Sequence, residues 1–201
     1  MTDIYICSLI PLHVFFDYFD LKTLLIMKQV SHVVNRKIIE IARPLVTISD
    51  FRQGFTIMKT FKNARLSAPH DNYSLNDSNI GLLSKIINLR IGVGFKSRPK
   101  ITDAGLSKLV DLVKLNISQN EIITGEAFKF LSKLKTLQME RCKNITSEQI
   151  NLYLTNLTNL DISNNNKITD LALKNLSKLC CLKLSGNCQI TDAGIENLTI
   201  S

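Results

Sequence analysis

The sequence predicts an α/β solenoid, in which a curved parallel sheet carries short helices on its convex side and a small helical domain precedes it. Two observations predict this fold. A pattern of apolar residues returns every 22 or 23 residues over the second half of the chain, whereas the first forty residues take no part in it. A fixed period of about 20–50 residues is the signature of stacked repeats, whose units complete one another's core.

The repeat is clearest in four segments of eleven residues that align without gaps. They begin at Leu115, Leu137, Leu160 and Leu182, and two more apolar residues precede each of them at intervals of three. The unit is therefore LxxLxxLxLxxNxxIT. Two degenerate units lie upstream, and LVTIS at 45–49 is a candidate leading strand. We count about six units over 44–201.

Each unit predicts a strand, a turn and a helical return. Leu160 and Ile162 alternate with Asp161, as in a strand with apolar side chains inward. Asn165 then turns inward to bond backbone groups, and Thr169 or Asp170 caps the return. The same place is held by Asn120 and, with weaker bonding, by Cys142. The inward stripe of the return is Leu173, Leu176 and Leu179.

This unit resembles the leucine-rich repeat. The tails ITDAGL (101–106), ITDLAL (168–173) and ITDAGI (190–195) are similar to its cysteine-containing subtype, which often accompanies F-boxes. The resemblance implies a leucine-rich repeat solenoid that presents a concave sheet to a protein partner.

The first forty residues predict two or three short amphipathic helices. Pro11 suits a helix start. Asp20 is expected to cap the second helix and Ser31 the third.

This segment resembles the F-box. The family's Ile-Phe, Leu-Asp, Leu-Leu and Val-Ser steps fall on 15–16, 19–20, 24–25 and 30–31 without a gap. The sequence departs from the pattern at Cys7-Ser8, where Leu-Pro is usual, and at Val34, where Trp is usual. The resemblance implies an F-box-like domain at 1–43 that binds a Skp-type adaptor. Its implied contacts are Pro11, Phe15, Phe16, Phe19, Leu24, Leu25 and Val30. A second interpretation stays open, in which residues 5–40 only cap the first repeat.

Charge and cysteine content exclude several classes of protein. The net charge of +8 comes from 25 Lys and Arg against 17 Asp and Glu without a dense basic run. This favours a solvated, mildly basic surface over a nucleic acid partner, although a nucleic-acid-associated protein is a third, less favoured hypothesis. Five cysteines without a CxxC pair argue against a disulfide framework. Asp3 and Pro11 interrupt any signal-peptide pattern, and no membrane span is expected. We therefore expect a cytoplasmic protein, with the nucleus as the other compartment.

We expect no enzyme, cofactor or metal. His13, His32 and His70 stand in no nucleophile or metal motif. Cys180, Cys181 and Cys188 lack the further ligand and the spacing of a zinc site. The GVG at 92–94 lacks the strand and helix that surround a nucleotide fingerprint.

The candidate target-binding surface is the concave sheet. Its outward residues form a predicted column of mixed charge, which a protein partner could contact residue by residue or which is simply solvated. Asn159, Asp161 and Ser163 are the expected contacts in one unit, and the basic insertion at 94–100 is a candidate contact for an acidic partner. The central column is Arg65, Arg90, Asn116, Gln138, Asp161 and Lys183; the flanking ones are Lys114, Thr136 and Asn159, and Ser118, Glu140, Ser163 and Ser185.

The leading functional hypothesis is a substrate-recognition adaptor of an SCF-type cullin–RING ubiquitin ligase, whose F-box binds the Skp-type adaptor while the repeats hold a target protein. The alternative is a non-enzymatic leucine-rich repeat scaffold or inhibitor with a helical cap and no ligase link.

Overall fold

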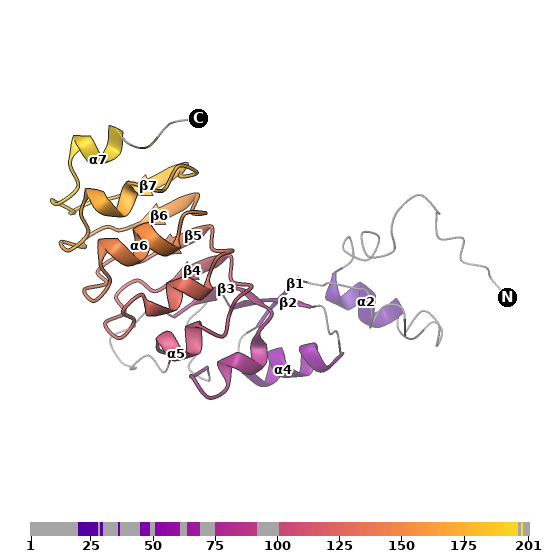
Figure 1. Ribbon diagram of the computed structural model, residues 1–201. Helices are drawn as coiled ribbons and strands as arrows, with labels where there is room; N and C mark the ends of the chain where they lie inside the picture. Colours follow the sequence, from indigo (N-terminus) through magenta and orange to yellow (C-terminus); the bar gives the residue numbers. More distant parts are fainter. Residues whose placement is uncertain are drawn as a thin grey trace, which may run out of the picture.

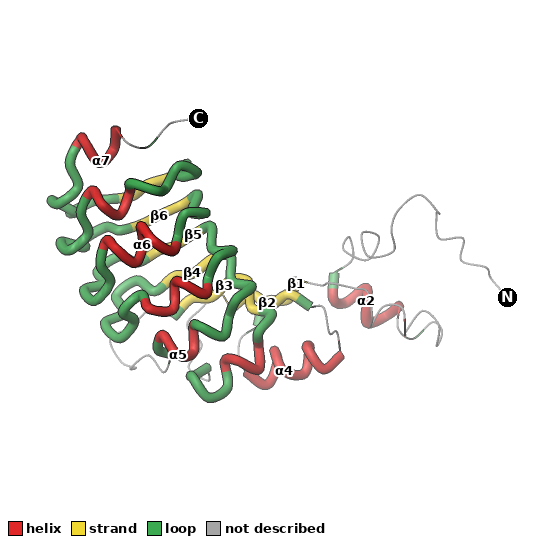
Figure 2. Tube along the Cα trace, viewed as in Figure 1, coloured by secondary structure: helices red, strands yellow, loops and turns green. Residues whose placement is uncertain are grey.

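The computed structural model describes residues 20–27, 29, 36, 45–48, 51–60, 64–68, 75–91, 101–196 and 198. Seven parallel strands stack in chain order into one sheet, β1 to β7, as predicted for a solenoid. Figure 1 shows the strands on one side of the stack and the helical returns on the other, and Figure 2 shows the same division by element type. The elements run α2 Leu21–Met27, β1 Leu45–Thr47, α4 Phe51–Thr60, β2 Arg65–Ala68, η1 Ile80–Leu83, β3 Ile86–Arg90, α5 Asp103–Leu106, β4 Lys114–Asn116, η2 Glu126–Phe130, β5 Thr136–Gln138, α6 Ser147–Tyr153, β6 Asn159–Asp161, η3 Asp170–Leu173, β7 Cys181–Lys183 and α7 Asp192–Glu196.

The leading strand and the six repeat strands predicted from the sequence are confirmed. Residues 45–47 of the LVTIS segment form β1, which pairs with β2, and the later strands follow one in each unit. The apolar positions of the repeat form one continuous core, which includes Leu115, Leu137 and Leu160 at 2 % exposure or less. Each such side chain contributes roughly 1.5–3 kcal/mol on burial.

The returns are shorter than ordinary helices. The unit from Leu137 to Leu160 has 23 residues and forms the seven-residue helix α6, which starts with a capping box between Thr146 and Gln149. Its 22-residue neighbours form only the 3₁₀ turns η2 and η3. Of these three units, the one with an additional residue is the one whose return is α-helical.

The inward turn residue is confirmed in three units. Asn120 and Asn165 are buried, and Asn165 Nδ2 donates to the Met139 carbonyl of the preceding unit at 2.6 Å. Cys142 occupies the same place, and its thiol donates to the Ile117 carbonyl at 3.0 Å. Burial raises the pKa of the Cys142 thiol to about 11, so this thiol stays protonated and keeps its donor.

A second connection joins the returns on the convex side. The Asp170 carboxylate accepts the Thr191 backbone amide at 2.7 Å and the Thr191 hydroxyl at 2.6 Å. Asp77 bonds Thr102 and Asp103 bonds Thr124 in the same way, while Ser147 accepts the Thr169 amide. Thr169 does hold the predicted N-cap position, but its side chain makes no capping bond there. The Asp170 carboxylate therefore accepts hydrogen bonds from the next unit and does not cap its own return.

This connection explains the glycine in the ITDAG tails. A Cβ at Gly194 would lie 2.2 Å from Asp170 Oδ1, and a Cβ at Gly105 would lie 2.2 Å from Asp77 Oδ1. The carboxylate of one unit thus occupies the space that a side chain of the next unit would need.

One sequence prediction needs correction, and several others lie outside the described residues. The apolar spacing predicts Arg65 beside Arg90, but a register shift between Leu66 and Ser67 puts Ala68 opposite Leu89. Arg65 instead pairs with Leu45 of β1, so the central column begins at Arg90. The predictions for Pro11, Phe15, Phe16, Phe19, Val30 and Ser31, for the three histidines and for the insertion at 94–100 lie outside the described residues.

The buried amide of Asn165 predicts a loss of stability on truncation. Asn165→Ala should lower the free energy of unfolding by roughly 1–3 kcal/mol, because it leaves the Met139 carbonyl and the Cys142 amide without partners. Thermal and urea unfolding measure this change. Asn166→Ala, at an exposed neighbouring position, is the control; equal melting temperatures for the two variants would contradict the inward role.

The Asp170 connection predicts a pH dependence. Hydrogen bonds from the Thr191 hydroxyl and backbone amide lower the pKa of the Asp170 carboxyl. A lowered folded-state pKa gives stability that is present above the unfolded-state pKa and is lost as the pH falls through the folded value. The melting temperature of Asp170→Asn should therefore lie below that of the wild type near neutral pH, and the gap should close in acid.

Asp192→Asn is the matched control for this titration. Asp192 is the equivalent residue of the last unit and has no following unit to bond among the described residues. Thermal melts from neutral to about pH 3 should show no comparable gap for this variant. A gap for Asp170→Asn that is independent of pH would contradict the ionic origin of the effect.

Candidate functional site

The concave face is built by the register of the sheet. Asn116 pairs with Gln138, Gln138 with Asp161 and Asp161 with Lys183, so these side chains form one row across β4 to β7. Arg90 pairs with Asn116 and extends the row to β3. The sequence-predicted column is therefore brought together by the structure except for Arg65. We call it the central row: Arg90, Asn116, Gln138, Asp161 and Lys183.

Two further rows flank the central row. The strand-start row begins at Ser67, whose hydroxyl accepts Asn88 Nδ2 at 3.1 Å, and continues through Lys114. Sequence spacing missed Ser67 and Asn88, because the irregular β2 hides their register. The strand-start row is Ser67, Asn88, Lys114, Thr136, Asn159 and Cys181. The strand-end row, which follows the strands, is Ser118, Glu140, Ser163 and Ser185.

Several side chains of the central row make hydrogen bonds within the fold. Asn116 Nδ2 donates to Gln138 Oε1 at 2.7 Å, and Asn116 Oδ1 accepts the Ser118 amide at 2.9 Å. Asp161 Oδ1 accepts the Ser163 amide at 3.1 Å. These side chains close the strand ends, so their positions are fixed before any partner arrives.

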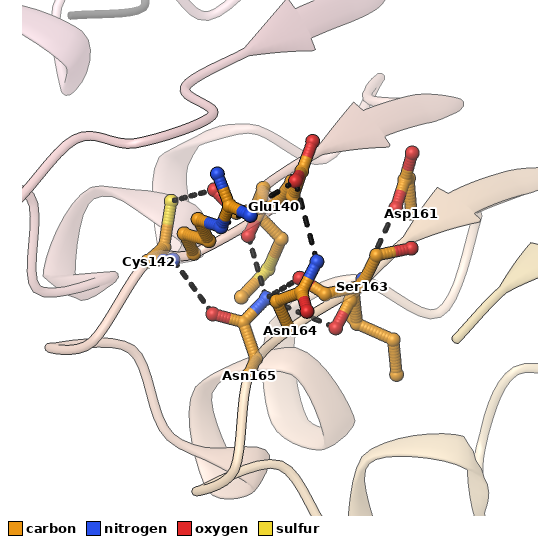
Figure 3. A network of polar contacts seen from close by, with 9 residues as sticks. Glu140, Cys142, Asp161, Ser163, Asn164 and Asn165 are labelled. Carbon is orange, nitrogen blue, oxygen red and sulfur yellow. Dashed lines mark hydrogen bonds and ion pairs between the residues drawn. The ribbon is translucent and has the colours of Figure 1, made fainter. Parts of the chain in front are cut away.

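Ser163 is not available as the contact that the sequence suggested. It is only 9 % exposed, and its carbonyl oxygen accepts bonds from the Arg141 amide and from Asn165 Nδ2. Figure 3 shows Ser163 beside Asn165 inside the turn, whereas Asp161 lies at the edge of the same network. The exposed member of this stretch is Asn159.

The turns after β4, β5, β6 and β7 each carry a left-handed residue. Gln119, Arg141 and Asn164 have φ of 63°, 56° and 59°, and Gly186 follows at 69°. Asn tolerates this conformation and Gly favours it, while Gln and Arg are held in it by the repeat. The side chains at these places flank the strand-end row: Asn164 Nδ2 donates to Glu140 Oε1 at 3.3 Å, and Arg141 Nε lies 3.7 Å from the same oxygen.

The charged groups of the face divide into paired and unpaired ones. Glu140 is engaged by Arg141 and Asn164, as above. Lys114, Asp161 and Lys183 form no ion pair in the part of the chain that the structure describes. The unpaired groups alternate in sign along the sheet, positive on β4, negative on β6 and positive on β7.

The helix α2 carries the described part of the predicted adaptor site. Asp20 caps it, as predicted, by accepting the Thr23 amide at 2.7 Å, and this backbone bond, together with the Thr23 hydroxyl, lowers the pKa of the Asp20 carboxyl. Leu24 is completely buried, whereas Leu25 and Ile26 are 43 % and 57 % exposed. Figure 1 shows α2 beyond β1, at the opposite end of the stack from β7.

The described residues include no group of three or more His, Cys, Asp or Glu side chains that could hold a metal ion. Among the described helices, none combines the length and the apolar character needed to cross a bilayer.

Comparison with known proteins identifies the type of repeat. The family model described as "Leucine Rich repeat" matches residues 153–177 and 175–198, so the chain contains leucine-rich repeats. No curated protein matches the chain. Leucine-rich repeats form a fold that binds protein partners, which is the function class that the concave face supports.

Two solved structures share this fold. A chain of the Rad7–Elc1 complex in yeast is 17 % identical with a TM-score of 0.55, over 82 % of this chain and 48 % of that one. The present chain thus spans about half the length of that chain. Internalin C2 of Listeria monocytogenes str. 4b F2365 is 19 % identical with a TM-score of 0.50, over 94 % and 93 % of the two chains. At these identities the likeness concerns the fold alone.

Exposed, unpaired lysines on the concave face should tolerate substitution. Lys114→Glu and Lys183→Glu should each change the free energy of unfolding by no more than about 0.5 kcal/mol, because neither side chain is buried or ion-paired within the described chain. Urea denaturation monitored by circular dichroism measures this. A loss above about 1 kcal/mol would show that these lysines stabilise the fold and are not free to serve a partner.

Proposed function

We propose that this chain is the substrate-recognition adaptor of an SCF-type cullin–RING ubiquitin ligase. In this proposal residues 1–43 form an F-box-like domain that binds a Skp-type adaptor, and residues 44–201 form the repeats that hold a target protein. The chain performs no chemistry; it raises the effective concentration of the target at the ligase. We place it in the cytoplasm, with the nucleus as the other compartment.

The observation that carries the proposal is the exposed apolar side of α2. Leu25 and Ile26 stay open to solvent on a helix whose other side is anchored by the buried Leu24. An end cap would bury its aliphatic side chains against the first repeat, whereas an adaptor surface leaves some of them exposed for the partner. Within the F-box-like set, Leu24 then supports the helix, and Leu25 makes the contact.

The separation of the two surfaces also supports the proposal. The α2 helix lies beyond β1, while the unpaired charges of the concave face lie on β4 to β7 (Figure 1). An adaptor on α2 and a target on the central row would not compete for the same residues. The similar fold in the Rad7–Elc1 complex is that of a protein found in a two-protein assembly.

The alternative function is a leucine-rich repeat scaffold or inhibitor without a ligase link. The buried Leu24 and the contact of Leu21 with the core of the repeats favour it, because an end cap needs this packing. The two functions differ in one property, the affinity for a Skp-type adaptor.

Co-purification with a Skp-type adaptor tests the proposal. The intact chain should retain the adaptor, and Leu25→Ser should weaken binding by at least tenfold, since buried apolar contacts dominate such interfaces. Leu82→Ser is the matched control, because Leu82 is a similarly exposed leucine in the repeats. Phe15→Ala/Phe16→Ala tests the remaining part of the predicted F-box.

No binding by the intact chain would contradict the ligase function and leave the scaffold. Equal losses for Leu25→Ser and Leu82→Ser would also contradict it, because the adaptor surface would then not be on α2.

A further inference from the structure

The unpaired charges of the concave face have a fixed arrangement. Lys114 on β4 and Asp161 on β6 are separated by two strand spacings across the sheet and by two residues along the strands. With neighbouring strands about 4.8 Å apart and a rise of about 3.3 Å per residue, these positions are about 12 Å apart. An extended peptide covers that distance in about three to four residues.

Each of these charged groups has room for one more partner. Asp161 uses Oδ1 for the Ser163 amide, and Oδ2 makes no hydrogen bond in the described part of the chain. Lys114 is exposed and makes no ion pair there. Glu140 differs, because Arg141 and Asn164 already hold its carboxylate. Over β4–β6 the face therefore offers one cationic contact, Lys114, and one anionic contact, Asp161, with polar amides between them.

Partners of a single charge sign fit this face poorly. A wholly acidic partner would meet the carboxylates of Asp161 and Glu140, and a wholly basic one would meet Lys114 and Lys183. Lys183 is the next residue of the central row after Asp161, so the negative charge on this part of the face is limited to the Asp161 position. No aromatic side chain stands in the three rows of the described strands, which leaves nothing for nucleobases to stack on.

We propose that the concave face over β4–β6 binds an extended protein segment of mixed charge, in which an acidic side chain and a basic side chain stand three or four residues apart. Lys114 holds the acidic side chain, and Asp161 holds the basic one. Asn116 and Gln138, already joined to each other, lie under the backbone between them. The inference rests on the proposed function only in taking this segment to belong to the target.

Short synthetic peptides test the proposal on the intact chain. The mixed-charge probe carries one Asp and one Arg four residues apart in a Ser/Gly background, and the controls carry two Asp or two Arg at the same places. At low salt the mixed-charge peptide should bind about three- to tenfold more tightly than either control. Amide shifts measured by NMR should map to β4–β6.

Charge reversal of the protein provides the decisive comparison. Lys114→Glu should shift the preference to the two-Arg peptide, and Asp161→Lys should shift it to the two-Asp peptide, whichever direction the peptide runs. Asp161→Asn should only remove the preference for Arg, and circular dichroism checks that every variant is folded. Lys167→Glu, on an exposed turn lysine of the same unit, should keep the wild-type order.

The outcomes separate this inference from the proposed function. An unchanged order of the peptides in both reversal variants would overturn it, as would a wild-type preference for a peptide of one sign or the absence of amide shifts at millimolar peptide. Binding of the Skp-type adaptor is measured in a separate experiment. If the chain does not bind the adaptor but still prefers the mixed-charge peptide, the ligase function is contradicted and the peptide inference stands.

Discussion

The structure depends on one buried polar contact that recurs in successive units. After β4, β5 and β6 the chain reverses inside an apolar core, where an unpaired carbonyl costs roughly 1–3 kcal/mol. Asn120, Cys142 and Asn165 meet this need by bonding the strand-end carbonyls of Ile91, Ile117 and Met139 in the preceding unit. Because each bond joins two units, it also fixes how one strand lies against the next.

The rows of the concave face follow from that register. Asn116, Gln138 and Asp161 face the same side because the inward residues beside them, Leu115, Leu137 and Leu160, are in register. On the convex side the Asp–Thr bonds hold the returns together in the same manner, with a small residue where the carboxylate sits. The surface that meets a partner is thus positioned by residues that the partner never touches.

The unit that begins at Leu182 is packed less completely than the units before it. Asn187 Nδ2, equivalent to the bonding amide of Asn165, is buried and has no acceptor among the described residues. Leu182 and Leu184 are only partly buried, whereas Leu160 and Ile162 in the unit before are 2 % and 0 % exposed. Among the described residues, strands pair with β6 on both of its sides but with β7 on one side only, which accounts for the greater exposure of Leu182 and Leu184.

The sequence alone could predict most of this fold, because the repeat places the same demand on the same position in each unit. Gapless spacing of 22 or 23 residues predicts the strands, the inward Asn and even Cys142 in its place. It failed where the period fails: the shift in β2 removed Arg65 from the central row. The repeat spacing also could not show that Ser163 is buried in the turn, because the burial of a side chain depends on the chain segments packed around it.

The Asp–Thr hydrogen bonds between the returns on the convex side could be predicted only in part. The recurring Thr-Asp pair indicated a helix cap, which is a local role, whereas the Asp170 carboxylate bonds a threonine 21 residues further along. Local propensity cannot distinguish these two partners. The pairing state of Lys114 and Asp161 likewise depends on the distance between side chains in the folded sheet.

Native-state hydrogen exchange of the Cys142 amide tests the central claim most directly. This amide donates at 2.6 Å to a side-chain oxygen, Asn165 Oδ1, while the Ile117 and Met139 amides bond strand carbonyls. If the buried turn contact holds the units together, the Cys142 amide exchanges as slowly as those two and opens with them as denaturant rises. Exchange of Cys142 at the rate of an exposed turn, with Ile117 and Met139 still protected, would contradict the account.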